Sequence, residues 1–545
     1  MKKIFLFVAF LPLFLLAQVI QPDTNQLNFG NVFVGERDTL SLTLHNLHWD
    51  TLKVTGIKFY TIYNETPFSA SEEIFSIPVN GSHTIEVYFE PVQNILHNSE
   101  MVVQHNAKSG FEAVDLLGQG KFPLTYYDTT ENMVEEDLKK ALHWKLAQGY
   151  LQASYSAARD EMFMEIDNEK NNGQAATTNT LECVYTGTVK TGYTSRSNAQ
   201  TTSPNFNTEH TFPQGFFSSS LPERSDLHHL FPTTNSSNSQ RGNDPFGTVS
   251  TASATYNVGG SKSDGNTFEP RDDQKGTTAR AMMYFVLRYE DFSNHFSTQE
   301  TVLRDWHSDF PVDSVEERRN EDIFDFQKNR NPFVDYPQLE ERITKFVATS
   351  NAPVQYGLDI LQSSIDFGAI VDYDSLDYVL INRGNQTIDF SNFALSDTSL
   401  SFVDSSGRDR SILPGDAIEI KVEIRTSGSK AINEDLTFDT SIPGGLSSLT
   451  IPIKGQSIIV SVEENDLFEG VKVYPNPIRE KLYIESNGDT GFQFRFLDAI
   501  GREVPLAITS LQNSKIVIST EQLNKGVYFI ELSQGEKRSV KKLVK

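Results

Sequence analysis

The sequence predicts a multidomain chain in which one α+β domain lies between all-β sandwiches, with a further β-sandwich at the carboxyl end. At 545 residues the chain is too long to fold around a single core. Residues 138–168 are rich in Ala, Leu, Lys, Glu and Met, which favour helix. On both sides of this region, short alternating runs end in Asn, Gly or Asp, which is typical of strands and tight turns.

The first residues predict export. Met1, Lys2 and Lys3 precede an almost wholly apolar run over 4–17 that ends in the small residue Ala17. This pattern indicates a signal peptide over 1–17 that is too short to anchor the chain in a membrane. No other run approaches the roughly 18 apolar residues that a span needs, so we expect no transmembrane segment.

Two segments of the chain resemble each other. The motif Leu-Asn-Phe-Gly-Asn-Val at 27–32 is matched by Ile-Asp-Phe-Gly-Ala-Ile at 365–370. An alternating run follows each copy, and each copy closes on a Gly-Gln pair. This spacing predicts two immunoglobulin-like β-sandwiches, at 18–122 and 355–458. Both resemble the ASH-type or choice-of-anchor modules that flank secreted bacterial enzymes. We expect them to act as spacers, with glycan or surface binding as the alternative.

A cluster of polar residues between 207 and 243 carries the chemistry. Hydrolysis of a phosphodiester requires a base, a hard cation at the phosphate oxygens and a positive group for the charge that develops. His210 can serve as the base because imidazole titrates near neutral pH. Glu209 and Asn238 offer the oxygen ligands that Mg²⁺ prefers. Arg241 offers a planar cation suited to phosphate.

The local sequence predicts how this cluster is held. Residues 208–213 and 227–232 alternate and end in proline, which indicates two short strands. Thr233 or Thr234 can cap a short helix that runs to Arg241, with Gly242 just past its end. Two strands and a helix around one cation form the ββα-metal, or His-Me finger, arrangement.

At this point the chain resembles the bacterial endonuclease I family, whose members are secreted or periplasmic and cut DNA and often RNA without sequence preference. The resemblance covers roughly residues 124–345 of the α+β domain, which is predicted at 123–350, because several unrelated blocks occur in the family's order. These blocks lie at 154–156, 162–163, 166–168, 268–271, 276–284, 306, 311–312, 316–320 and 327–335. The resemblance implies a single divalent cation, Mg²⁺, with Mn²⁺ or Ca²⁺ as alternatives.

Transferred to this chain, the family's roles make His210 the general base and Glu209 with Asn238 the metal ligands. Some relatives place a transition-state arginine in a long cysteine-containing loop between the strands, whereas this loop spans only 214–224. Either Arg224 or Arg241 could supply that cation. The chain has one cysteine, so we expect no intrachain disulfide.

Other polar residues of the domain have structural alternatives. We expect Asp226 and His228 to brace the strand pair or to support the residues around the metal. Zinc at the adjacent histidines is disfavoured, because no third soft ligand accompanies them at useful spacing. Glu269 and Arg280 could form a buried pair with each other or take part in function.

The last segment, 463–545, predicts a β-sandwich of its own. It contains a Tyr-Pro-Asn-Pro sequence at 474–477, a Gly-Val-Tyr-Phe strand at 526–529 and a basic end. Together these features resemble the C-terminal sorting domain of the type IX secretion system. The resemblance implies the type IX secretion machinery as a partner and a secreted or cell-surface location.

Charge constrains how the chain meets a polyanion. It carries 47 Lys and Arg against 72 Asp and Glu, a formal net charge of −25, whereas nucleic-acid binders are generally basic. The stretch 196–288 around the cluster has equal numbers of acidic and basic residues, so a bound cation would make it positive. We therefore expect weak long-range steering of the substrate.

Together these features predict a secreted, monomeric, Mg²⁺-dependent nonspecific endonuclease acting on DNA, with RNA as a second substrate. Two alternatives remain open. One is an extracellular binding or adhesion protein with an inactive nuclease fold, and the other is a metallophosphatase.

Overall fold

The computed structural model describes residues 20–545 apart from 48–49, 61–66, 108, 291–293, 372, 404–405, 427, 459–470, 487–492, 499–501, 513–514, 525 and 535–536. The predicted signal peptide and the first residues of the predicted sorting domain, 463–470, lie outside the described residues. Within the described part of the chain, no helix has the length and apolar character needed to cross a membrane.

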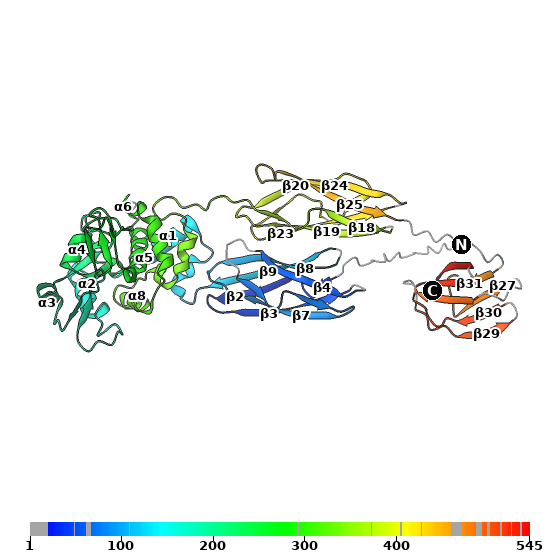
Figure 1. The fold of residues 1–545 in the computed structure, drawn as a ribbon, viewed down its shortest axis with the longest axis horizontal. Coiled ribbons are helices and arrows are strands. Elements are labelled where there is room, and N and C mark those ends of the chain that lie inside the picture. The colour runs from blue at the N-terminus through cyan, green and yellow to red at the C-terminus, as the bar shows by residue number, and fades with distance from the viewer. Residues whose placement is uncertain are drawn as a thin grey trace, which may run out of the picture. The chain divides into compact units, whose positions relative to one another are not determined.

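The amino-terminal domain is a sandwich of two sheets (Figure 1), with strand orders β1-β3-β7-β5 and β2-β9-β8-β4-β6. Its strands alternate in burial, so that Leu42 on β3 lies opposite Ile85 on β7 and both face the core. The strands are β1 (Ile20–Pro22), β2 (Gln26–Phe33), β3 (Asp38–Asn46), β4 (Leu52–Tyr60), β5 (Phe68–Ala70), β6 (Phe75–Ile77), β7 (Ser82–Phe89), β8 (Leu96–His105) and β9 (Phe111–Lys121).

The domain formed by β17 to β25 has the same architecture. Its sheets have the orders β17-β19-β23-β21 and β18-β25-β24-β20-β22, so each strand corresponds to the strand sixteen labels earlier. The repeated motifs of the sequence are strands β2 and β18, which occupy equivalent positions. The strands are β17 (Leu358–Ile360), β18 (Ile365–Ile370), β19 (Tyr373–Asn382), β20 (Ile388–Leu395), β21 (Leu400–Phe402), β22 (Arg410–Ile412), β23 (Ala417–Arg425), β24 (Ala431–Thr440) and β25 (Ser448–Ser457).

The carboxy-terminal domain is also built from two sheets, with orders β26-β27-β30-β29 and β28-β31-β32. Its core includes Leu482, Ile484, Ile518 and Ile530. The strands are β26 (Val471–Tyr474), β27 (Lys481–Ser486), β28 (Gln493–Asp498), β29 (Ile508–Gln512), β30 (Lys515–Ser519), β31 (Val527–Gln534) and β32 (Lys537–Val544).

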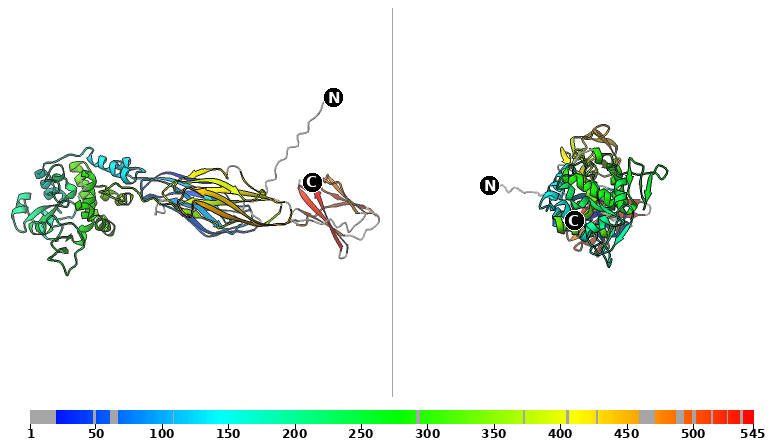
Figure 2. Two further views of the ribbon diagram at one scale, coloured as in Figure 1. Left: turned by 90° about the horizontal axis from the view of Figure 1, so that it is seen from above. Right: turned by 90° about the vertical axis from the view of Figure 1, so that its left-hand side faces the viewer.

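The helices lie in the central domain, coloured cyan to green in Figure 2. The longer helices are α1 (Glu135–Ala147), α2 (Tyr155–Glu161), α5 (Asp272–Tyr289), α7 (Glu300–Asp309) and α8 (Ser314–Gln327). The shorter ones are α3 (Arg196–Thr201), α4 (Asn235–Arg241), α6 (Asn294–Ser297) and α9 (Pro332–Asp335). Tight turns of other helix types lie at η1 (Thr125–Thr130), η2 (Met162–Ile166), η3 (Glu223–Ser225), η4 (Leu227–His229) and η5 (Pro337–Arg342). The small strands are β10 (Thr180–Glu182), β11 (Val189–Thr191), β12 (Phe206–His210), β13 (Leu230–Thr234), β14 (Tyr256–Val258), β15 (Ser261–Ser263) and β16 (Phe268–Glu269).

The helix-rich stretch 138–168 divides into separate pieces. Helix α1 ends at Ala147, and Gly149 then takes a positive φ of 76° that a residue with a side chain adopts at a cost. Helix α2 begins only at Tyr155, where the side chain of Ser154 caps it by accepting from Ala157 N. Composition therefore favours helix here, but the glycine and the cap set where each helix begins and ends.

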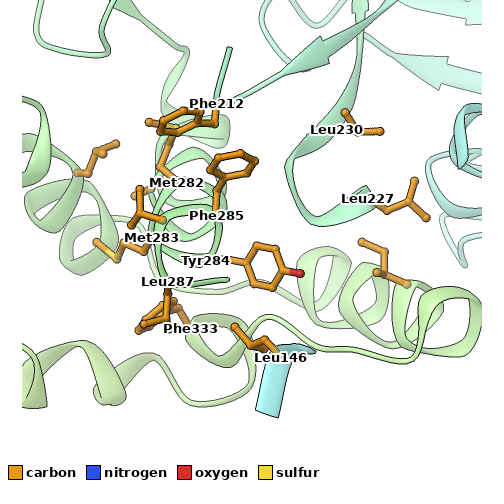
Figure 3. Close-up of a cluster of buried hydrophobic side chains, with 14 of the residues drawn as sticks. Leu146, Phe212, Leu227, Leu230, Met282, Met283, Tyr284, Phe285, Leu287 and Phe333 are labelled. Atoms are coloured by element: carbon orange, nitrogen blue, oxygen red, sulfur yellow. The ribbon is translucent and has the colours of Figure 1, made fainter. Parts of the chain in front are cut away.

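Helix α5 forms the centre of this domain and is buried along most of its length. Figure 3 shows its residues Met282, Met283, Phe285 and Leu287 within one cluster. Phe285 stacks on Phe212, with ring centroids 4.3 Å apart and planes 13° apart. Because Phe212 lies two residues beyond the end of strand β12, this stack fixes the end of β12 against the core.

Strands β12 and β13 pair antiparallel, from Phe206 opposite Thr234 to His210 opposite Leu230, and helix α4 follows β13 at once. The predicted strand limits, 208–213 and 227–232, are wrong. Residues 227–229 form the turn η4 instead, because the side chain of Asp226 accepts a hydrogen bond from His228 N and curls the chain.

The cap of α4 agrees with the prediction. The Thr234 hydroxyl accepts from Ser237 N, and Gly242 ends the helix at a φ of 55°.

Candidate active site

Glu209 lies on β12 with its carboxylate directed into the protein, and only 3% of the side chain is exposed. Its Oε1 accepts a hydrogen bond from the Tyr185 hydroxyl at 2.9 Å and lies 3.2 Å from Nε of Arg241. Burial raises the pKa of Glu209 to about 7, against the opposing effects of Arg241 and Tyr185. Its second oxygen, Oε2, has no hydrogen-bond donor among the described residues, so one oxygen is left for a ligand.

Asn238 lies on α4, which contacts both strands of the pair. Its side chain is half-buried and forms no hydrogen bond within the described part of the chain. Glu209 Oε2 and the Asn238 amide therefore provide hard oxygen donors that the fold itself does not use. This donor set fits a cation such as Mg²⁺, which takes one or two protein ligands and keeps water or phosphate in its other positions.

Soft-metal binding has no comparable support. Over the described residues, no group of three His, Cys, Asp or Glu side chains could hold a metal ion. The adjacent histidines are engaged elsewhere, with His228 Nε2 3.1 Å from the Asn329 carbonyl and His229 Nε2 2.6 Å from the Glu223 carbonyl. The single cysteine, Cys183, is buried and free, and it accepts a hydrogen bond from Thr234 N at 3.3 Å.

His210 is the last residue of β12 and is 7% exposed. Its Nε2 atom is buried and has no hydrogen-bond partner, which is costly unless a water or a ligand supplies one. Burial lowers the pKa of His210 well below its ordinary value, and His229, Arg224 and Arg159 act in the same direction, against a hydrogen bond to the Arg224 backbone. The imidazole is therefore neutral at neutral pH and can accept a proton.

The two candidate arginines occupy different environments. The Arg241 side chain is fully buried, donates to the Thr211 and Gly242 carbonyls and lies over the Phe246 ring. Its guanidinium thus holds Glu209 instead of facing the surface, which favours Arg224 over Arg241 as the arginine that serves a phosphate.

Arg224 is half-buried, lies 4.3 Å from the centroid of the Tyr155 ring, and its Nε has no hydrogen-bond partner. Of the two candidates, Arg224 is the one whose charge remains available.

Asp226 braces the turn before β13. Its carboxylate accepts from the hydroxyls of Tyr284 (2.7 Å) and Tyr289 (2.6 Å) and from Gln327 Nε2 (2.7 Å). Burial alone raises the pKa of Asp226, but His228 and the other neighbours bring it below its ordinary value. Asp226 and His228 therefore act within the fold, as one of the two predicted roles requires.

Glu269 and Arg280 do not pair with each other. Arg280 on α5 forms a buried ion pair with Glu316 on α8, with Nε 2.9 Å from Oε1. Glu269 on β16 instead pairs with Lys262 at 2.8 Å and with Lys275 at 2.9 Å. Arg280 is committed to the α5–α8 contact, whereas Glu269 precedes α5 and meets a lysine near the start of that helix.

Sequence reasoning missed Tyr155 and Arg159. The Tyr155 ring centroid lies 5.6 Å from that of His210, and Arg159 donates from Nε to the Thr208 hydroxyl at 3.0 Å. The four-residue spacing of Tyr155 and Arg159 could have indicated a shared site, because residues four apart lie on one face of a helix. Nothing in that spacing indicated that this face lies beside His210.

Comparison with known proteins agrees with this geometry. Residues 133–338 match the model of the Endonuclease I family, 472–545 match the Secretion system C-terminal sorting domain, and 19–117 match the HYDIN/CFA65/VesB-like, Ig-like domain. The family resemblance that the sequence predicts is thereby confirmed. The sorting domain directs the chain to the type IX secretion system.

Two curated proteins are similar to the central part of the chain. The extracellular ribonuclease of Bacillus subtilis (strain 168) is 31% identical over 237 residues, which are 40% of this chain and 78% of that protein. The extracellular ribonuclease of Bacillus amyloliquefaciens is 30% identical with the same coverage. Among solved structures, the ASH / PapD-like domain of human CEP192 is 13% identical and covers 23% of this chain and 99% of that one, with a TM-score of 0.19. The protein is thus a secreted nuclease and belongs to the Endonuclease I family.

Proposed function

We propose that the protein is a divalent-cation-dependent endonuclease of the ββα-metal type that cleaves DNA and RNA by attack of water, with Mg²⁺ as the cation. The observation that carries this proposal is the pairing of two unused groups on one strand. Nε2 of His210 is buried without a partner, and the neighbouring Glu209 keeps one carboxylate oxygen without a donor. A proton acceptor next to a free anionic ligand is the minimum that metal-assisted hydrolysis requires.

In the proposed reaction, His210 Nε2 takes a proton from a water molecule as the water oxygen attacks phosphorus. The bond between phosphorus and O3′ breaks, which leaves a 5′-phosphate on one product and a 3′-hydroxyl on the other. A cation held by Glu209 and Asn238 would neutralise the phosphate and the leaving oxygen. A positioned base of this kind contributes roughly 10²–10⁴-fold in rate.

The substrate class follows from both the residues and the relatives. The two similar Bacillus proteins are named extracellular ribonucleases, which supports RNA as a substrate. A water nucleophile needs no 2′-hydroxyl, so the same site would also act on DNA. This mechanism distinguishes the protein from ribonucleases that use the 2′-hydroxyl of the RNA substrate as the nucleophile.

The decisive experiment compares plasmid DNA, a 20-nucleotide RNA and p-nitrophenyl phosphate as substrates, with Mg²⁺, with EDTA, and with EDTA followed by excess Mg²⁺. We expect EDTA-sensitive, restorable cleavage of both nucleic acids, 5′-phosphate ends by mass spectrometry, and no phosphatase activity. Terminal 2′,3′-cyclic phosphates on RNA would refute the water mechanism. Phosphatase activity alone would indicate a metallophosphatase, and complete inactivity would indicate a binding protein.

The matched variant is His210→Ala. We expect it to fold normally and to lose at least about a hundredfold in cleavage rate, because water loses its positioned base. A loss below about tenfold in a normally folded protein would exclude His210 as the base.

A further inference from the structure

Two guanidinium groups lie against a single tyrosine ring beside His210. Cζ of Arg159 lies 4.8 Å from the Tyr155 ring centroid, and Cζ of Arg224 lies 4.3 Å from it. Tyr155 and Arg159 come from helix α2, whereas Arg224 comes from the turn η3 that precedes β13. Side chains from two distant parts of the sequence therefore converge at the end of β12.

Neither arginine has a carboxylate partner among the described residues. Arg159 uses only its Nε, which donates to Thr208, and the Arg224 side chain donates no hydrogen bond within that part of the chain. The carboxylate next to Arg159 in sequence, Asp160, is taken by Arg196 at 2.7 Å. Glu223, next to Arg224, forms no ion pair in the described structure.

The lack of a carboxylate partner distinguishes Arg159 and Arg224 from most other arginines of the domain. Most of them have a carboxylate within ion-pairing distance, and their partners are Glu209 for Arg241, Glu182 for Arg271, Glu316 for Arg280, Glu300 for Arg304, Asp167 for Arg319 and Asp335 for Arg330. Arg288 forms no ion pair in the described structure, but it lies over the rings of Tyr150 and Tyr289 without a second guanidinium group on either ring. Most guanidinium groups of the domain thus have a carboxylate partner, whereas those of Arg159 and Arg224 lie together without one.

This arrangement is costly without a ligand. Two like charges against one ring repel each other, and partial burial removes much of the water that would screen them. The contact with the tyrosine ring offsets part of this cost and restricts each guanidinium group, whose remaining N–H donors then suit the oxygens of one phosphate. An anion placed here would relieve the repulsion and pair the free donors.

We propose that Arg159, Arg224 and Tyr155 form an arginine clamp that binds a phosphate group of the nucleic-acid substrate beside His210. The identity of the ligand as a nucleic-acid phosphate rests on the proposed function. The clamp positions the substrate through its backbone, so it recognises phosphate without reading bases. Arg159 also connects the clamp to β12 through Thr208, the residue before Glu209.

The test measures binding separately from cleavage. In the His210→Ala background, a fluorescein-labelled 12-nucleotide RNA is titrated by fluorescence anisotropy across a salt series at fixed Mg²⁺. Arg159→Gln and Arg224→Gln should each weaken binding about tenfold or more. Each should also flatten the plot of log Kd against log salt by about 0.7, the value for one lost contact to a single strand.

Arg196→Gln is the matched control, because Arg196 is a nearby arginine whose charge is already paired with Asp160. We expect it to leave both affinity and slope unchanged. Arg159→Lys should keep the slope, since the charge remains, but recover only part of the affinity because a lysine cannot bind phosphate in a bidentate manner.

An unchanged slope in both glutamine variants, with normal circular dichroism, would overturn the clamp. Should loss of the Thr208 bond unfold Arg159→Gln, Arg224→Gln decides alone, because its side chain donates no hydrogen bond in the described structure. Failure of the proposed function would give a result different from failure of the clamp. The wild type would then show no EDTA-sensitive cleavage, whatever the binding slopes are.

Discussion

Arg241 and Glu209 form an ion pair inside the central domain, with Nε 3.2 Å from Oε1 and both side chains buried. The guanidinium also donates to two backbone carbonyls, so its position is fixed from three directions. The pair holds the Glu209 carboxylate with one oxygen tied down and the other available. Arg241 therefore fixes the position of the Glu209 carboxylate.

Replacement of Arg241 should damage the fold itself. We expect Arg241→Gln to lower the free energy of unfolding by about 3–5 kcal/mol, because it leaves a buried carboxylate without its partner. Urea unfolding followed by tryptophan fluorescence can measure this, since Trp144 and Trp306 both lie in the central domain. The control is Arg224→Gln, which should change stability by less than about 0.5 kcal/mol. Equal, small effects in the two variants would mean that the buried pair contributes little.

Asn238→Ala should weaken cation binding while leaving stability unchanged. Its side chain makes no hydrogen bond in the described structure, so the fold loses nothing when it is shortened. We expect apparent Mg²⁺ affinity to fall at least about tenfold, as measured by calorimetry and by the Mg²⁺ dependence of cleavage. Excess Mg²⁺ should restore part of the activity. Asn235→Ala, on the exposed first turn of the same helix, is the control, and unaltered Mg²⁺ binding in Asn238→Ala would remove this residue from the ligand set.

The central domain should lose stability in acid. Burial lowers the pKa of His228, His295 and His307 to about 4 in the folded protein, from an ordinary value near 6.5. Their contribution is fully present above about pH 6.5 and is lost as the pH falls toward 4, because the unfolded chain then binds more protons. Glu209, whose pKa is about 7, acts in the opposite direction but is a single group. We expect the melting temperature of this domain to fall steadily from pH 6.5 to pH 4, and a constant or rising value would contradict the burial of these imidazoles.

Asp226→Ala separates structural from metal-supporting roles. The substitution removes the acceptor for Tyr284, Tyr289 and Gln327, so three buried donors lose a partner. We expect a loss of about 3 kcal/mol or more in stability. Mg²⁺ affinity measured well below the melting temperature should stay as in the wild type. A selective loss of Mg²⁺ affinity without destabilisation would show that Asp226 supports the metal ligands instead.

Local chemistry was predictable from sequence, and long-range pairing was not. The cap by Thr234 and the end at Gly242 follow from residues within one helical turn. The limits of β12 and β13 depended on the Asp226 turn, which competes with strand pairing over the same residues.

The ion-pair partners required knowledge of packing. Arg280 meets Glu316 only because α5 and α8 come together, whereas the sequence left open a pair between Arg280 and Glu269. Arg159 was missed for the same reason. Its spacing from Tyr155 is visible in the sequence, whereas its position beside His210 depends on how α2 packs near the end of β12.

The core of the central domain begins before the family match. Phe122, the residue after β9, stacks on Tyr336 with ring centroids 3.7 Å apart, and the fully buried Tyr127 donates to Asp335. Both aromatic residues precede position 133, where the Endonuclease I match starts. A recombinant fragment cut at position 133 would therefore lack two pieces of its own interior and expose the surfaces that they cover. A fragment that keeps these two aromatic residues should begin no later than Phe122, so the start of the family match and the start of the folded interior are different places in the chain.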